Sequence, residues 1–285
     1  MADHLVAGKN HPEDGFLRRV SNRVETSSPA RLNFLGTPLV LTTYEAWTDF
    51  LQRRTRDETP LSVDFSNTQI VVMRRSEARF REQTSRVDYF VPDGMPLIWC
   101  LNWKGAGLRD RVYGPTFMRR CVLASPAPFT HYFLGGSEEC LTRLKDVFLR
   151  EQPQLRIVGA HHGYFPPEQD AEIIAEINRL SPDFIWIGLG TPKQQAWIHQ
   201  HKHEFRRGVI LAVGQAFDVN AGTKKDAPLW MQRLGLTWLF RMAVEPKRLI
   251  KRYVRYNSLF FFYLIGDGLR GRAFAARGAA EDVRS

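Results

Sequence analysis

Short apolar runs alternate with longer segments of helical spacing from about residue 61 to residue 218. The apolar runs predict strands at 61–65, 87–91, 131–134, 155–160, 184–189 and 208–213, and the segments between them predict helices at 68–82, 95–103, 115–123, 138–151, 167–180 and 192–203. A strand pair at 32–41 and a helix at 43–53, capped by Thr42 or Thr43, precede them. Strands that alternate with helices of this length form mostly parallel sheets. We therefore expect an α/β fold, a Rossmann-like mostly parallel sheet with helices on both faces.

The length of 285 residues suits one sizeable domain with an appendage. Residues 1–30 are polar, which predicts a poorly ordered segment, and their start lacks the charged and apolar pattern of a secretory signal. Residues 31–228 form the predicted α/β core. The composition then changes, so that 229–268 predict a helical appendage and 269–285 a flexible tail.

An aspartate in a Pro-Gly turn, Asp93, directly follows the apolar run that ends at Val91. A turn at the end of a strand can present one carboxylate to a crevice, where it is a candidate general base. The alternative is a plain turn that links a strand to a helix, which is the usual role of an isolated Asp-Gly pair.

Two further glycine-rich turns follow apolar runs, at Gly135-Gly136 and at 188–194. Glycine lets backbone N–H groups approach a phosphate, and a helix N-terminus adds a favourable dipole. Pro192 suits the start of the second helix, and Lys193 adds a positive charge there. The turn at 188–190 lacks the third glycine of a dinucleotide fingerprint and is not a Walker loop. Each turn alone is typical of a tight βα connection, whereas together they indicate one crevice at the carboxyl ends of several strands.

The formal net charge of +10 indicates an anionic partner: nucleic acid, anionic lipid or a phosphorylated substrate. No recognised nucleic-acid-binding module is present, so nucleic acid is the least favoured of the three. Cys100, Cys121 and Cys140 form no paired motif and are expected to be reduced, structural thiols. His161 and His162 are adjacent, which is poor spacing for two ligands of one metal.

Aromatic and basic residues are interleaved from Trp230 to Ile265. The apolar run at 259–265 is far shorter than the roughly 20 residues that span a bilayer. Such a segment suits the interface of a membrane, but it equally suits a C-terminal helix pair that packs on the domain with its basic residues in solvent. The residues alone leave both possibilities open.

The chain resembles the WecG/TagA/CpsF family of bacterial glycosyltransferases (glycosyltransferase family 26) from about residue 33 to residue 264. The resemblance rests on the order and spacing of the blocks at 92–95, 111–114, 133–136, 163–165, 188–194, 214–218, 221–223, 235–241 and 245–246. Members transfer a sugar from a nucleotide-sugar, usually UDP-linked, onto a sugar carried by undecaprenyl diphosphate at the inner face of the cytoplasmic membrane. The resemblance thus implies an inverting, UDP-sugar-dependent hexosyltransferase of surface-polysaccharide or exopolysaccharide synthesis.

The resemblance implies roles for single residues. Asp93 matches the proposed catalytic base, Arg111 a cation near the donor diphosphate, and Asn67 and Gln194 polar residues of the site. Further positions that the matching blocks place at the substrate are Gly135, Gly136, Tyr164, Gly188, Gly190, Pro192, Lys193, Gly214, Phe217 and Asp218. The C-terminal segment resembles a mobile appendage that covers the active site and contacts the membrane. Its basic positions near the lipid or nucleotide diphosphate are Arg241, Arg248, Lys251 and Arg252.

The chain departs from the family pattern at three positions. Phe65 stands where Thr is frequent, Gln195 where Glu is frequent, and Asp226 where Arg is frequent. We interpret Asp226 as a surface variation. Phe65 and Gln195 are the features that would fit a catalytically inactive, membrane-associated scaffold. Retention of Asp93, Asn67, Arg111 and Gln194 argues against that alternative, and the lack of a full dinucleotide loop argues against an epimerase.

The expected partners are a UDP-sugar, a polyprenyl-diphosphate-linked sugar and the cytoplasmic face of the inner membrane, to which the protein binds peripherally. Nucleic acid is not among them, and a homo-oligomer is possible because relatives self-associate when the appendage is displaced. No cofactor is expected, since no Asp-x-Asp motif indicates a metal. The Phe65 departure, with Gln215 and Asn220, favours UDP-glucose and the glucose-transferring branch. UDP-N-acetylmannosamine or its uronic acid is the alternative donor.

Overall fold

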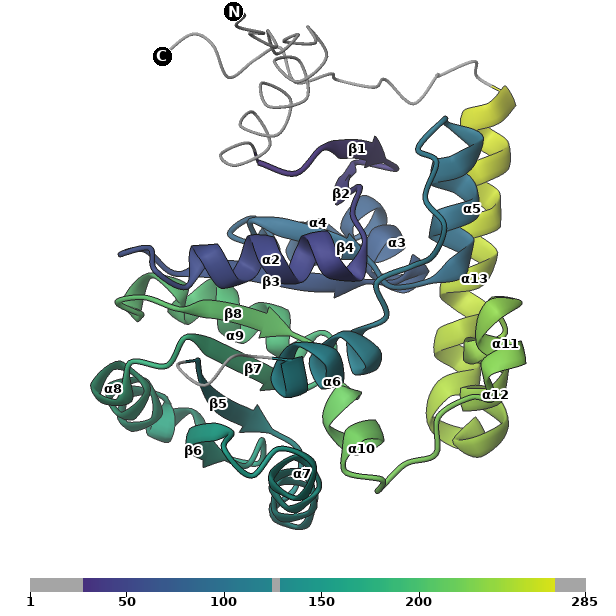
Figure 1. Cartoon of the computed structure of the whole chain (residues 1–285). Coiled ribbons are helices and arrows are strands. Elements are labelled where there is room, and N and C mark those ends of the chain that lie inside the picture. The colour runs from purple at the N-terminus through teal and green to yellow at the C-terminus, as the bar shows by residue number, and fades with distance from the viewer. Residues whose placement is uncertain (1–27, 125–128, 270–285) are drawn as a thin grey trace, which may run out of the picture.

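The computed structural model describes residues 28–124 and 129–269 of the chain (Figure 1). The poorly ordered start predicted for residues 1–30 and the flexible tail predicted for 269–285 therefore lie almost wholly outside the described residues. The strands are β1 (Arg31–Phe34), β2 (Thr37–Val40), β3 (Leu61–Ser66), β4 (Tyr89–Pro92), β5 (Thr130–Gly135), β6 (Arg156–His161), β7 (Phe184–Gly188) and β8 (Val209–Ala212).

One sheet of 8 strands contains all of them, in the order β1-β2-β4-β3-β8-β7-β5-β6. Only the β1–β2 hairpin is antiparallel among the described strand pairs, and every other pairing is parallel. The predicted α/β class with a mostly parallel sheet is therefore confirmed.

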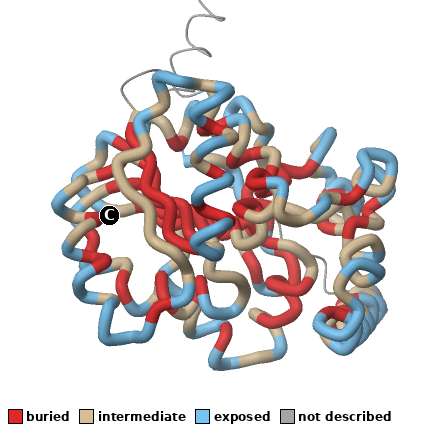
Figure 2. The backbone as a smooth tube through the Cα atoms, turned by 90° about the horizontal axis from the view of Figure 1, so that it is seen from below, coloured by how far each residue is buried: buried red, intermediate tan, exposed pale blue. Residues whose placement is uncertain are grey.

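Helices cover both faces of this sheet, because successive strand residues point to opposite sides. In β7, Phe184 and Trp186 enter one core cluster and Ile185 and Ile187 another. The first face packs against α2 (Tyr44–Arg54), α6 (Gly114–Ala124), α7 (Glu138–Glu151) and α10 (Ala216–Asn220). The second packs against α3 (Thr68–Ser76), α4 (Ala78–Gln83), α5 (Met95–Trp103), α8 (Asp170–Leu180) and α9 (Lys193–His201). Figure 2 shows the buried strands at the centre, with exposed backbone around them.

Three predicted helices differ in detail from the structure. The helix predicted over 68–82 is divided at Glu77, whose backbone is extended, and Arg81 donates to the carbonyl oxygens of Arg74 and Arg75 at the end of α3. Short 3-10 turns, η1 (Pro167–Gln169) and η2 (Lys202–Glu204), replace the first turn of the helix predicted over 167–180 and the last turn of the one predicted over 192–203.

The helix predicted as buried over 95–103 is α5, and that prediction is wrong for one of its faces. Leu97, Ile98 and Leu101 are buried, but Trp99 and Trp103 are 50% and 77% exposed. A helix that is apolar all round gives no period from which to tell a core face from an outer face.

The C-terminal segment consists of α11 (Leu229–Arg233), α12 (Thr237–Val244) and α13 (Pro246–Leu269). Tyr256 and Phe260 of α13 enter the core cluster of α3 and α5, and Asp267 forms a two-bonded ion pair with Arg75 of α3 at 2.7 Å. The segment is thus packed on the domain. Within the described ranges no helix combines the length and the apolarity needed to cross a bilayer.

Candidate active site

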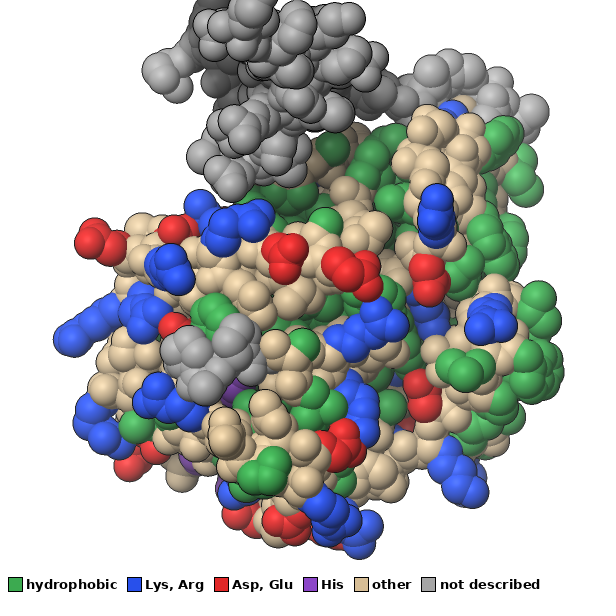
Figure 3. Space-filling model, in the orientation of Figure 1, with side chains coloured by type: hydrophobic (Ala, Val, Ile, Leu, Met, Phe, Trp, Pro, Cys, Tyr) green, Lys and Arg blue, Asp and Glu red, His purple; other side chains and the backbone are tan. Residues whose placement is uncertain are grey.

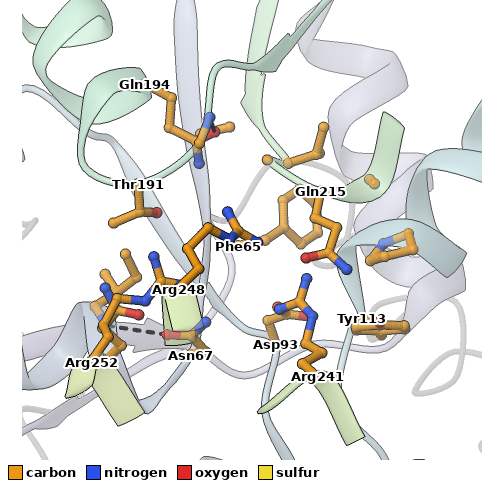
Figure 4. Close-up of a pocket in the computed structure, with 18 residues that line it drawn as sticks. Phe65, Asn67, Asp93, Tyr113, Thr191, Gln194, Gln215, Arg241, Arg248 and Arg252 are labelled. Carbon is orange, nitrogen blue, oxygen red and sulfur yellow. Dashed lines mark hydrogen bonds between the residues drawn. The ribbon is translucent and has the colours of Figure 1, made fainter. Parts of the chain in front are cut away.

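A cavity of about 140 Å³ opens at the carboxyl ends of the four central strands β3, β4, β7 and β8 (Figure 4). Ligands of doubly wound sheets bind at this edge. Four loops and the C-terminal helices contribute its lining, which includes Phe65, Asn67, Gln69, Asp93, Tyr113, Gly190, Thr191, Gln194, Gly214, Gln215, Arg241, Arg248 and Arg252. A second, smaller cavity of about 60 Å³ shares Asn67, Asp93, Tyr113 and Arg241 with the first and adds Arg111. Asp93 therefore lies where the two cavities meet.

Hydrogen bonds to the end of β3 and to the start of α6 hold Asp93 in place. The Asp93 N–H donates to the Ser66 carbonyl oxygen at 2.8 Å, and the Gly114 N–H donates to Asp93 Oδ1 at 2.9 Å. Burial raises the pKa of Asp93 above its ordinary value, while the charges of Arg111 and Arg241 and the Gly114 hydrogen bond act in the opposite direction. A carboxylate that is oriented, partly desolvated and open to a cavity is suited to accept a proton.

Two amide side chains border the Asp93 cavity. Asn67 caps α3, because its Oδ1 accepts the Ile70 N–H at 3.2 Å, and the hydrogen bonds among the described residues leave its amide nitrogen unused. Gln194 lies in the first turn of α9 and accepts the Gly190 N–H through Oε1 at 3.2 Å. Both residues close a loop and line the cavity at the same time.

Three arginines from the C-terminal helices enter the larger cavity. The Nε atoms of Arg241 and Arg252 are buried and have no hydrogen-bond partner in the described part of the chain. Neither side chain has a carboxylate within 4 Å among the described residues, whereas Arg248 pairs with Glu245 at 2.5 Å. Figure 4 shows Arg241 beside Asp93, with Arg248 and Arg252 on the opposite side of the cavity. Guanidinium groups that line a small cavity without a carboxylate partner, as Arg241 and Arg252 do, are suited to bind an anion such as a diphosphate.

Gly135, Gly136 and Gly188 of the predicted glycine turns are packed against neighbouring loops and line neither of the two cavities. A Cβ at Gly135 would lie 2.5 Å from the Gly188 backbone, and a Cβ at Gly188 would lie 2.9 Å from the Phe217 ring. The Gly136 N–H donates to the Gly188 carbonyl oxygen and the Gly163 N–H donates to that of Gly136. These glycines thus allow close approach of three loops, and two of the N–H groups are engaged within the protein.

The remaining predicted site residues line neither of the two cavities. Tyr164 is 79% exposed, and Pro192 immediately precedes α9. The Lys193 ammonium donates to the Gly163 carbonyl oxygen at 3.0 Å. Asp218 pairs with Lys224 at 3.3 Å. Lys251 is exposed on α13. Their predicted substrate contacts stay predictions.

Residues that the sequence did not single out as site residues also line the cavities, chiefly Tyr113, Thr191 and Trp238. Tyr113 could have been found, because it belongs to the block at 111–114 that supplied Arg111. The described residues hold no group of three or more His, Cys, Asp or Glu side chains placed to bind one metal ion.

Gln195 has a buried partner that explains why an amide stands at this position. Its Nε2 donates to Asp64 Oδ2 at 2.7 Å, and the Ser66 hydroxyl donates to Asp64 Oδ1 at 2.6 Å. Burial raises the pKa of Asp64, and the two hydrogen bonds lower it in part. A second carboxylate at position 195 would face Asp64 directly. The departure is therefore matched to its surroundings and is no sign of a degraded site.

We expect Gln195→Glu to lower the free energy of unfolding by about 2–3 kcal/mol at neutral pH, since two buried carboxylates cannot both ionise at this distance. A shared proton raises the folded-state pKa above the unfolded value. The stability is then present at acid pH and is lost as the pH rises through the folded-state pKa. Chemical unfolding at pH 5 and pH 8 measures this, with Gln200→Glu on the exposed side of α9 as control. Equal stability of Gln195→Glu and wild type at pH 8 would contradict the prediction.

Fold and site together define a doubly wound α/β protein with an arginine-lined cavity and an oriented carboxylate at the carboxyl edge of its sheet. The chain belongs to the WecG/TagA/CpsF family of glycosyl transferases, whose family model matches residues 32–273. The resemblance inferred from the motifs is thereby confirmed.

Similar proteins occur in several strains of Staphylococcus aureus. In strains NCTC 8325 and COL, an N-acetylglucosaminyldiphosphoundecaprenol N-acetyl-beta-D-mannosaminyltransferase is 27% identical over 231 residues, covering 79% of this chain and 89% of the relative. The enzyme of the same name in strain MRSA252 is 27% identical over 230 residues.

Proposed function

We propose that this glycosyltransferase moves a sugar from a UDP-sugar onto a sugar carried by a polyprenyl diphosphate, with inversion and with Asp93 as general base. The observation that carries the proposal is the cavity that Asp93 shares with Arg241 and Arg252, neither of which has a carboxylate within ion-pair distance among the described residues. The carboxylate can accept the proton of the acceptor hydroxyl, and the guanidinium groups can stabilise the negative charge of the leaving diphosphate. The reaction needs both effects.

The reaction balances with these groups alone. An acceptor hydroxyl oxygen attacks the anomeric carbon, and its proton passes to Asp93. The bond from the anomeric carbon to the diphosphate oxygen breaks, and UDP leaves with the bonding electrons. Arg241 and Arg252, with Arg111 from the smaller cavity, stabilise the charge that grows on the diphosphate. We propose that these guanidinium groups serve in place of a metal ion.

We propose glucose as the donor sugar. Phe65 borders the cavity with an apolar ring, whose centroid lies 5.1 Å from that of Phe117 and which offers no hydrogen bond. A buried N-acetyl group needs polar partners, which a ring does not supply. N-acetylmannosamine is the second candidate, because the staphylococcal relatives are named for its transfer.

We propose that the C-terminal helices and α5 bind the cytoplasmic face of the inner membrane peripherally. Figure 3 shows apolar side chains gathered on α11, α12 and α13. The most exposed of them include Leu229, Trp230, Leu234, Val244, Val254, Phe261, Phe262 and Ile265. Trp99 of α5 lies against this segment, because a Cβ at Gly235 would be 2.8 Å from its ring, and Trp103 follows one helical turn later. Tryptophan and basic residues together favour an anionic lipid interface.

The double variant Trp103→Ser/Trp230→Ser should bind vesicles that contain anionic lipid about tenfold more weakly. Each substitution removes an exposed ring whose apolar surface would be buried in the lipid interface. Co-sedimentation with vesicles measures this affinity. Both side chains are at least 60% exposed, so the melting temperature should not change. Leu149→Ser on α7 is the matched control. Unchanged vesicle binding by the double variant would remove α5 and α11 from the membrane face.

The proposed function is tested by UDP release in the presence of a synthetic polyprenyl-diphosphate-linked sugar, with a panel of UDP-sugars and with a chelator in parallel. Release that requires the acceptor and selects UDP-glucose supports the proposal. Selection of UDP-N-acetylmannosamine would overturn the donor assignment alone. A rate that falls with chelator and returns with added metal would overturn the role given to the arginines. No release with any donor would favour the inactive scaffold.

A further inference from the structure

Asp226 lies in the loop that leads into α11, and its carboxylate accepts hydrogen bonds from three neighbouring groups. The Tyr113 hydroxyl donates to Asp226 Oδ1 at 2.8 Å, and Gln232 Nε2 donates to Asp226 Oδ2 at 3.1 Å. The Ala227 N–H donates to Oδ1 at 2.8 Å. The interpretation of Asp226 as a surface variation is therefore wrong, because both oxygens are committed to partners and one partner lines both cavities.

Gln232 extends this chain of hydrogen bonds to Arg111. Its Nε2 also donates to the Ala227 carbonyl oxygen at 2.8 Å, so two acceptors fix which end of the amide carries the nitrogen. The opposite end, Oε1, accepts from the Arg111 guanidinium at 3.1 Å. A continuous series of contacts thus runs from Tyr113 through Asp226 and Gln232 to Arg111.

Arg111 is held by neutral groups on two sides. The Gln232 amide oxygen meets one edge of the guanidinium, and the Tyr113 ring lies 4.1 Å from its central carbon. In the part of the chain that the structure describes, no carboxylate lies within ion-pair distance of Arg111, although its side chain is only 6% exposed. Because neutral partners orient a guanidinium without cancelling its charge, Arg111 keeps that charge available for an anion.

We propose that Asp226 and Gln232 are positioning residues that orient Arg111 and Tyr113 for transfer. Asp226 fixes the Tyr113 hydroxyl and the Gln232 amide, and Gln232 fixes Arg111 toward the cavity that contains Asp93. We call the hydrogen-bonded series from Tyr113 through Asp226 and Gln232 to Arg111 the relay. Since Gln232 belongs to α11, the relay joins the C-terminal segment to the donor side of the site. This inference rests on the proposed function and deepens it.

A double-mutant cycle tests the relay with the full chain. We expect Gln232→Ala to lower kcat about tenfold with little change in the KM for the donor. A tenfold effect lies within the range of coupling energies measured between side chains in contact. Arg111→Ala should lower kcat further, and adding Gln232→Ala to it should cost nothing more. Additive losses in the double variant would overturn the proposal, because a merely structural Gln232 would act independently of Arg111.

Two conservative variants sharpen the result. Gln232→Glu places a carboxylate against Arg111 and against Asp226, so we expect a larger loss of kcat than with Gln232→Ala. Asp226→Asn keeps the shape but not the charge and should be non-additive with Tyr113→Phe. Lys225→Ala, at the exposed neighbouring position, is the control and should retain wild-type rates. Wild-type kcat in Gln232→Glu would overturn the relay.

A wild type that transfers no sugar would defeat the proposed function and still leave the relay testable. The same four proteins of the Gln232–Arg111 cycle would then be compared for binding of inorganic pyrophosphate by calorimetry. Non-additive losses of affinity would support the orientation of Arg111 by Gln232. Affinities that fall additively, or that do not respond to Gln232→Ala, would overturn it.

Discussion

Asp93→Asn is expected to lower kcat by about 10³-fold, within the range of general-base catalysis, while the affinity for UDP stays within a factor of about two. The carboxylate lies at the junction of both cavities, and its amide counterpart cannot take a proton from an alcohol. The amide oxygen can still accept the Gly114 N–H, so the loop keeps its shape. Initial rates of UDP release and calorimetric titration with UDP measure the two effects.

The same substitution should raise stability at neutral pH. Burial raises the pKa of Asp93 in the folded protein above its unfolded value. The stabilising contribution is therefore complete below the unfolded pKa, and it is lost as the pH rises through the folded-state pKa. At neutral pH the ionised carboxylate destabilises the fold, and Asp93→Asn removes this cost. The activity of the wild type should fall as the pH is lowered and Asp93 is protonated. This fall should occur at a higher pH than it would for a carboxylate with an ordinary pKa. Asp146→Asn on the exposed face of α7 is the control.

Retention of most activity by Asp93→Asn would remove Asp93 from the role of base. Loss of activity together with loss of UDP affinity and a lower melting temperature would instead indicate a structural role. The combination that we expect, a slower enzyme that is more stable, is typical of a residue kept for function at the expense of folding.

Arg241→Ala is expected to lower kcat/KM by about 10²–10³-fold, the loss seen when one preorganised donor to a developing negative charge is removed. Its Nε is buried without a hydrogen-bond partner among the residues that the structure describes, and its side chain lines both cavities beside Asp93. Arg241→Lys should retain part of the rate, because an ammonium keeps the charge but loses the planar fork. Rates of UDP release over a range of donor concentrations measure both variants.

Arg255→Ala is the matched control for Arg241→Ala. This arginine belongs to the same C-terminal segment, but it is exposed and pairs with Glu77 away from the cavities. The rate of Arg255→Ala should stay within about twofold of wild type, because an exposed ion pair contributes little. Vesicle binding should be the same for both variants. Equal activity losses would show that the segment needs its total charge and that the position of Arg241 is unimportant.

Local sequence patterns were sufficient to predict the sheet and the cavity-lining residues that directly follow its strands. Alternating apolar runs predicted every strand after β2 to within two residues at each end, and Asn67, Asp93 and Gln194 each follow such a run. Parallel strands bring their carboxyl ends to one edge, so these side chains meet without any long-range information.

The rest of the site depends on contacts between distant segments. Asp64 lies inside an apolar strand, and its burial is explained by the hydrogen bonds from Ser66 and from the distant Gln195 of α9. Asp226 has the composition of a loop residue, and its role depends on Tyr113 and Gln232. Tyr256 and Phe260 have the same aromatic character as Phe261 and Phe262, yet the first two are buried and the other two are exposed. Composition could not divide that helix into its faces.

Different sides of α13 meet the core, the cavity and the exterior, and this restricts how its sequence can vary. Tyr256 and Phe260 enter the core, Arg252 enters the cavity, and Val254 and Phe261 face outward. A helix such as α7 has one buried stripe and tolerates polar exchange elsewhere on its surface. On α13, by contrast, buried, cavity-lining and exposed apolar side chains all occur within the turns from Arg252 to Phe261. Drift among descendants of this chain should therefore accumulate on α7 and slow down along α13, even far from the reacting atoms.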